Sequence, residues 1–75
     1  MTEKAAHKLL ENKTFGGYSG NAEFLRMNWN QLNNWCKGEI LVGIGAGQFA
    51  SAVAQSLMYA MAWEKYRAEF NKLVK

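Results

Sequence analysis

The side chains that most often carry enzyme chemistry are scarce in this sequence. It has one histidine, His7, and one cysteine, Cys36. Lys37 beside Cys36 is a cation of the kind that lowers the pKa of a thiol and makes it nucleophilic. No histidine lies near Cys36 in the sequence, however, and Cys36 falls on the apolar side of a predicted helix, which favours a packed hydrophobic role. We therefore expect Cys36 to be inert and His7 to be solvated.

The sequence predicts no metal site and no catalytic group. One cysteine cannot form an intramolecular disulfide, and the Cys and His spacings typical of zinc sites are absent. The expectation is a protein that is not an enzyme and that has no catalytic residues, no metal ligands and no cofactor.

One glycine motif, in contrast, suggests that the chain binds a cofactor. Ile40–Ile44 has the composition of a buried strand, and Gly45–Ala50 matches G-x-G-x-x-A. This stretch resembles the first βα unit of Rossmann dinucleotide-binding domains, which implies a pyrophosphate at the start of a helix over Ala52–Met61. Only about a dozen residues follow that helix, and they contain no second strand ending in an acidic residue. A dinucleotide-binding fragment is therefore the least favoured alternative.

The most distinctive feature is a charge-free segment from Ile40 to Trp63. It runs for 24 of the 75 residues, between Glu39 and Glu64. As one helix it would be about 36 Å long, enough to cross the roughly 30 Å hydrocarbon layer of a bilayer. We predict a long helix from about Glu39 or Ile40 to Leu73, with its first two-thirds buried by partners and its last third in water.

Small side chains recur every fourth residue along this segment. Such spacing lets two helix backbones approach closely, which is how helices associate in lipid and is also common in soluble helix packing. The predicted helix-packing interface consists of Gly43, Gly47 and Ser51 on one face and Ala46, Ala50 and Ala54 on an adjacent face.

The surroundings of the segment are typical of a membrane helix, but its apolarity is modest. The flanking aromatic residues, predicted to lie at a membrane interface or in a core, are Trp29, Trp35, Trp63 and Tyr66. Cations after the segment favour a cytoplasmic or matrix location for the C-terminus. Seven of the 24 residues are Leu, Ile, Val or Phe. They contribute roughly −2 to −4 kcal/mol to insertion. Gln48 and Gln55 add a polar stripe, so a soluble helical assembly stays open as an alternative.

Two regions precede the long helix. Residues 1–20 are expected to form a short helix capped by Thr2, followed by a glycine-rich loop. Residues 21–75 are expected to form the rest of the fold. There, Asn21 is the predicted N-cap of an amphipathic helix over Asn21–Lys37, and Gly38 is its predicted end.

Together these patterns predict an all-α protein. The expected elements are a short N-terminal helix, a Gly-rich loop, an amphipathic helix and one long Gly/Ala-rich helix, arranged as a helical hairpin or as a single-pass membrane helix. The net charge of +3 is too small and too dispersed to favour nucleic acid as a partner.

The function favoured by these patterns is that of a non-enzymatic small structural or accessory subunit. Its long helix would pack against other protein subunits, or against a second copy of itself, and the favoured setting is a membrane complex. The alternative is a soluble small binding or assembly protein, cytoplasmic or in a virion, such as a phage-type virion component or an inhibitor of a host enzyme.

Overall fold

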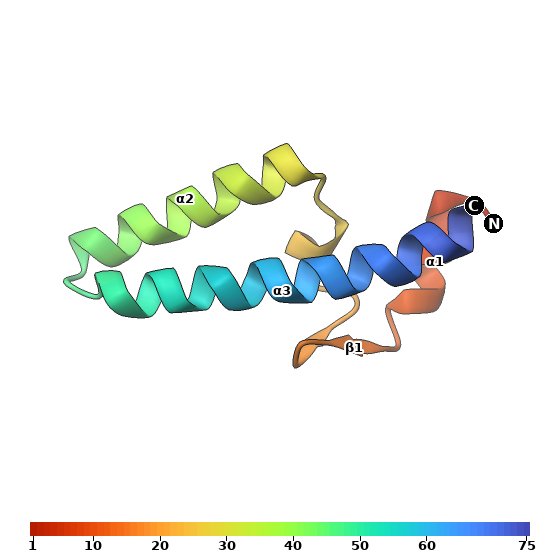
Figure 1. The fold of residues 1–75 in the computed structure, drawn as a ribbon, viewed down its shortest axis with the longest axis horizontal. Coiled ribbons are helices and arrows are strands. Elements are labelled where there is room, and N and C mark those ends of the chain that lie inside the picture. Colours follow the sequence, from red (N-terminus) through yellow and green to blue (C-terminus); the bar gives the residue numbers. More distant parts are fainter.

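The computed structural model, which describes residues 1–75, is a long helical hairpin with a small N-terminal unit packed at one end (Figure 1). Helix accounts for 73% of the residues, and the predicted all-α class is confirmed. In chain order the elements are α1 (Glu3–Leu10), β1 (Thr14–Phe15), β2 (Tyr18–Ser19), the 3-10 helix η1 (Glu23–Arg26), α2 (Trp29–Gly45) and α3 (Phe49–Val74).

Helix α1 begins where the sequence predicts. The Thr2 side chain accepts a hydrogen bond of 3.2 Å from the backbone N–H of Ala5, which satisfies one of the free donors in the first turn. The face carrying Ala6 and Leu10 is buried against α3.

The glycine-rich loop forms a tight β-hairpin. Phe15 pairs with Tyr18 and Thr14 with Ser19 in antiparallel register. The two residues of the turn, Gly16 and Gly17, have φ values of +59° and +88°. Positive φ at both central positions is the requirement of the hairpin turns that match strand twist, and glycine meets it without steric cost.

Helix α2 begins at Trp29, and the predicted amphipathic helix from Asn21 to Lys37 is wrong at both ends. The segment after Asn21 forms η1, which inserts Phe24 and Leu25 into the core. The true N-cap is Asn28: its side chain accepts from Gln31 N–H at 2.9 Å, and the Gln31 side chain accepts from Asn28 N–H at 3.0 Å. This reciprocal capping box fixes the start of the helix.

The end of α2 lies at Gly45, because the helix passes through Gly38 without interruption. Gly47 then adopts φ +73°, its N–H bonds to the Ile44 carbonyl at 3.1 Å, and Gln48 N–H bonds to the Gly43 carbonyl at 2.7 Å. This pair of bonds around a left-handed glycine is the Schellman motif, which ends a helix and reverses the chain.

The turn divides the charge-free segment between two antiparallel helices, so the predicted continuous helix from Ile40 to Leu73 is wrong. It also places Ile40–Ile44 in a helix, so the strand expected from the resemblance to a Rossmann βα unit is absent. No helix of the structure is both long enough and apolar enough to cross a bilayer.

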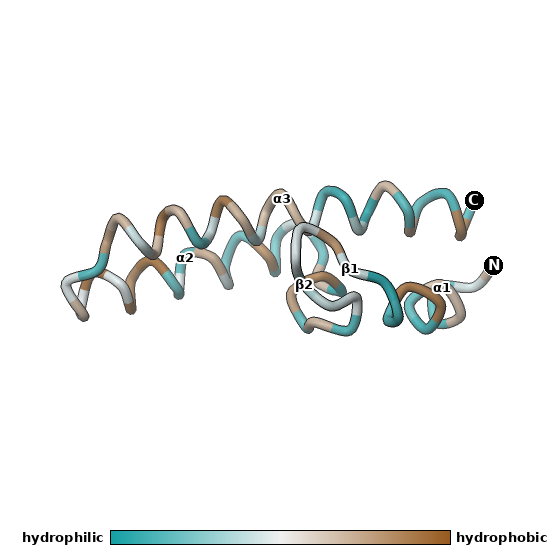
Figure 2. Tube along the Cα trace, turned by 90° about the horizontal axis from the view of Figure 1, so that it is seen from below, coloured by the Kyte–Doolittle hydropathy of each residue, from teal (hydrophilic) through white to brown (hydrophobic).

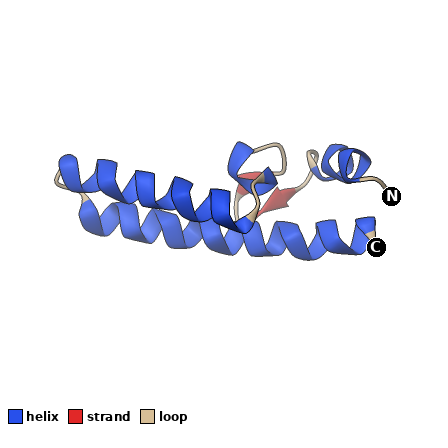
Figure 3. Ribbon diagram, turned by 90° about the horizontal axis from the view of Figure 1, so that it is seen from above, coloured by secondary structure: helices blue, strands red, loops and turns tan.

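The hydrophobic core lies at the end of the molecule opposite this turn (Figure 3). There the C-terminal half of α3 buries Ala62, Tyr66 and Phe70 against α1, the β-hairpin and η1. We call α1, the β-hairpin, η1 and α3 from Ala62 onward the body. Both chain termini lie at the body end (Figure 1).

The two helices continue beyond the body as a projecting pair, and we call residues 40–61 the arm. The molecule measures 44 × 22 × 15 Å, and the arm accounts for its elongation (Figure 1). At the base of the arm, the Trp35 ring packs against Phe24 and Tyr59, with centroid separations of 5.4 and 4.6 Å. Trp63 Nε1 donates to the Met27 carbonyl at 2.7 Å, which ties α3 to the segment before α2.

Substituting two glycines of α2 separately tests this geometry. A Cβ at Gly43 would collide with the Cβ of Ala52, whereas a Cβ at Gly38 meets nothing within 4 Å. We expect Gly43→Ala to lower the free energy of unfolding by about 1–3 kcal/mol through overpacking. Gly38→Ala should raise it by about 0.5–1 kcal/mol through helix propensity. Urea unfolding of the two variants measures both; equal effects would contradict the close contact between the helices.

Candidate interaction surface on the helical arm

The two helices of the arm approach each other closely along one line of contact. Gly43 is buried, and its backbone faces the side chain of Ala52. Ser56 is also buried on the α2-facing side of α3. Small side chains at these positions allow the helices to approach closely. The larger apolar side chains of the arm therefore lie outside this contact.

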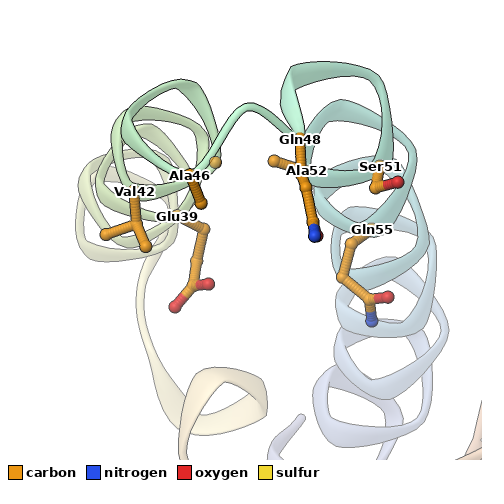
Figure 4. A pocket seen from close by; sticks show the side chains of 8 residues that line it. Glu39, Val42, Ala46, Gln48, Ser51, Ala52 and Gln55 are labelled. Carbon is orange, nitrogen blue, oxygen red and sulfur yellow. The ribbon is translucent and has the colours of Figure 1, made fainter.

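One broad face of the arm holds a groove, which we call the polar groove because it gathers the polar side chains of the arm, although Val42, Gly43, Ala46 and Ala52 also line it. It is an open depression of about 270 Å³ between the helices, and its polar lining residues are Glu39, Gln48, Ser51 and Gln55. Figure 4 shows Glu39 of α2, the N-cap residue Gln48 and Gln55 of α3 directed to the same side of the arm. The Gln55 amide donates to the Tyr18 hydroxyl at 2.5 Å, so this side of the arm is also the side of the β-hairpin.

The opposite face of the arm is apolar. Successive residues of a helix are about 100° apart, so the positions that lie roughly 60–140° beyond the line of contact, on the side away from the groove, point to the far side. On α3 these are Phe49, Val53, Leu57 and Ala60, and on α2 they are Ile40 and Ile44. We call these six residues the apolar face. None of them is charged or polar, in contrast to the groove.

The large side chains of the apolar face are not covered by the chain itself. Ile44 is 55% exposed, Phe49 56% and Leu57 62%. Leu41 and Met61, at its outer edges, are 67% and 59% exposed. Figure 2 shows hydrophobic positions recurring along the arm, while the C-terminal part of α3 is mostly hydrophilic. Several large, exposed apolar side chains on one face of a small chain are typical of an interaction site.

The small residues predicted to form a helix-packing interface are spread over the arm. Gly43 packs inside the hairpin, whereas Gly47 lies in the turn and contacts no other helix. Ser51 and Ala46 line the polar groove. Ala50 and Ala54 are exposed on the side of α3 that faces away from α2.

The four predicted interface or core aromatics lie at the base of the arm and in the body. Tyr66 is fully buried, and Trp35 and Trp63 are half-buried in the contacts described above. Trp29 is 52% exposed and lies with its ring centroid 5.5 Å from that of Trp63. None of the four residues belongs to the apolar face of the arm.

Cys36 and His7, the two side chains most suited to catalysis, are partly buried in packing contacts. Burial raises the pKa of the Cys36 thiol, so Cys36 is less nucleophilic than a free cysteine. No group of three His, Cys, Asp or Glu side chains is arranged to hold a metal ion. The expectation that His7 is solvated is wrong: it is half-buried, and its ring stacks on Phe70 at 4.6 Å.

His7 has a hydrogen-bonded partner from the other end of the chain. Its Nδ1 lies 2.5 Å from the Tyr66 hydroxyl. Burial raises the pKa of Tyr66, which keeps its hydroxyl protonated as a donor. Desolvation, together with the charges of Arg26 and Arg67, lowers the pKa of His7 below 6.5 and favours the neutral ring that accepts the bond.

No protein-family model, curated protein or solved structure matches this chain. The interpretation of the arm therefore depends on its own residues and geometry.

The sequence pattern did not reveal the apolar face. Its members, above all Ile44, Phe49 and Leu57, lie on two antiparallel helices joined by the turn at Gly47. Read as one helix, the segment shows no coherent apolar stripe that includes them. The dipeptide Gly47-Gln48 alone is too weak a signal to predict the turn. Without the turn, the sequence does not show that these residues share one face.

The His7–Tyr66 pair predicts a pH dependence of stability. The folded-state pKa of His7 is below its unfolded value of 6.5, so the unfolded chain binds the proton more readily. The contribution of His7 is complete above pH 6.5 and is lost as pH falls through the lower, folded-state pKa. Urea unfolding between pH 7.5 and about 5 should show stability decreasing with falling pH.

The matched variant for this prediction is His7→Gln, which removes the titrating ring. Its absolute stability will differ, but the slope of stability against pH over this window should be smaller than in the unchanged chain. An equal slope in both proteins would contradict the assignment to His7.

Proposed function

We propose that this chain is a small, non-enzymatic structural or accessory subunit whose helical arm packs into a larger protein assembly. The observation that carries the proposal is the apolar face, three of whose large side chains are more than half exposed in the isolated chain. The body already has its own core, so the arm is not needed to complete it.

Burial of this face by a partner is physically favourable. No residue between Ile40 and Trp63 is charged, so docking the face desolvates no ionised side chain of the arm. The gain for fully burying one Leu, Ile or Phe side chain is about 1.5–3 kcal/mol, of which about half is still available at the present exposures. The polar groove on the other side supplies the surface that stays in contact with water.

Two matched variants test the proposal in the cells that naturally produce the chain. The double variant Ile44→Gln/Leu57→Gln makes the apolar face polar, and Val42→Gln changes a 70% exposed side chain beside the groove. In a native extract separated by size, the unchanged chain and Val42→Gln should run in a complex of several subunits. The double variant should run as the free chain.

Circular dichroism of the purified variants controls for folding, since all three positions are exposed and tolerate glutamine. The proposal fails if the unchanged chain is found only as free monomer or dimer in the extract. It also fails if the double variant stays in the complex.

A further inference from the structure

We propose that the apolar face of the arm docks on the same face of a second copy, with the two arms antiparallel, so that four helices form one layered bundle. This inference rests on the proposed function, because it names the occupant of the same surface. It is argued from the shape, the area and the charges of the arm.

The shape of the face fits another two-helix layer. The apolar face presents side chains from two antiparallel helices that already pack side by side, with Ile40 and Ile44 on α2 and Phe49, Val53 and Leu57 on α3. Two such layers, stacked face to face, bury these rows between them as in four-helix bundles. Each polar groove then remains on an outer surface.

The area of the face, together with its edges, is that of one side of a small and weakly associating interface. Within the apolar face, the exposed fractions of Ile44, Phe49 and Leu57 correspond to roughly 350 Å² of accessible surface per copy. Leu41 and Met61 at its outer edges bring the total to roughly 600 Å², below the ~800 Å² that each partner contributes to a stable complex of standard size. The partly exposed Ile40, Val53 and Ala60 add to this figure. A partner with a much larger surface is not needed to cover the arm.

The charges of the chain favour the antiparallel arrangement. The net charge of +3 comes from residues outside residues 40–63, and most of the cations lie in the body. Antiparallel arms place the two cationic bodies at opposite ends, whereas parallel arms place them side by side. In a molecule 44 Å long, that separation exceeds the Debye length of about 8–10 Å at ordinary salt.

The ends of the arm are also complementary in the antiparallel arrangement. At the tip, the N-cap Gln48 makes no side-chain capping bond, so the first amide groups of α3 have no side-chain acceptor. At the base, Glu64 is exposed on the same side of α3 as the apolar face. In an antiparallel pair Glu64 of each copy lies toward the tip of the other, where its negative charge meets the positive end of a helix.

The first experiment measures the mass of the purified full chain by sedimentation equilibrium, from about 10 to 500 μM, a range suited to an interface of this size. We expect twice the 8.5 kDa of one chain at the upper concentrations. Ile44→Gln/Leu57→Gln should raise the dissociation constant about 100-fold. The control Val42→Gln should change it little. Leu57→Lys is a second variant, which should abolish pairing by placing like charges in the interface.

The second experiment tests the orientation by cross-linking single cysteines with a short bifunctional maleimide in a Cys36→Ser background. Phe49→Cys marks the tip and Glu64→Cys marks the base. A mixture of the two variants should give a tip-to-base cross-link, and Phe49→Cys alone should not cross-link to itself. Self-cross-linking at position 49 without the mixed product would establish a parallel pair and overturn the orientation.

The outcomes separate this inference from the proposed function. A chain that stays monomeric at about 500 μM overturns the pairing of copies. If that monomer nevertheless runs in a large complex in the native extract, the apolar face is covered by a different protein and the proposed function stands. If the purified chain pairs as expected but no larger complex exists in the extract, the pairing stands and the proposed function fails.

Discussion

The shape of the molecule depends on how much of the surface of α3 is buried by the rest of the chain. This helix is 26 residues long in a chain of 75, and the body packs mainly against its C-terminal half, reaching no further toward the tip than Gln55 and Tyr59. Tyr66 and Phe70 lie in that covered half and are almost completely buried, whereas Phe49 and Leu57 in the other half are more than half exposed. Helix α2 covers one side of the uncovered half and leaves an apolar side open. The elongated shape and the exposed arm both follow from this imbalance.

Close packing within the arm and exposure of its large side chains have the same origin. Gly43 lets α2 and α3 meet at backbone distance, and the contact with Ala52 uses small side chains. Ile44, Phe49 and Leu57 are therefore not required between the helices and point away from the seam. If large residues formed the contact between the helices, their side chains would be buried there. Because glycine and alanine form it, the large apolar side chains are exposed instead.

Local signals in the sequence predicted part of this fold. The Thr2 cap and the all-α class followed from side-chain chemistry and hydrophobic periodicity. The boundaries of α2 were not predicted, because the sequence offers several glycines and several asparagines near the two ends of this helix. Gly38 and Gly47 look alike in sequence, but only Gly47 is followed by backbone bonds that close a Schellman motif, and those bonds depend on the packing of α3. The Asn28–Gln31 capping box has a local signature in the sequence, but the prediction placed the N-cap at Asn21. The contact of His7 with Tyr66 joins residues 59 positions apart, and no local pattern predicts it.

The central claim is that the arm has no cover within its own chain and gains one only by association. Amide hydrogen exchange measured at increasing protein concentration tests it most directly, because the protection of the arm and that of the body are measured in the same sample. The account predicts that protection of α3 from Phe49 to Leu57 rises with concentration, while protection around Tyr66 stays constant. Protection of the arm that matches the body at the lowest concentration and does not change would contradict it.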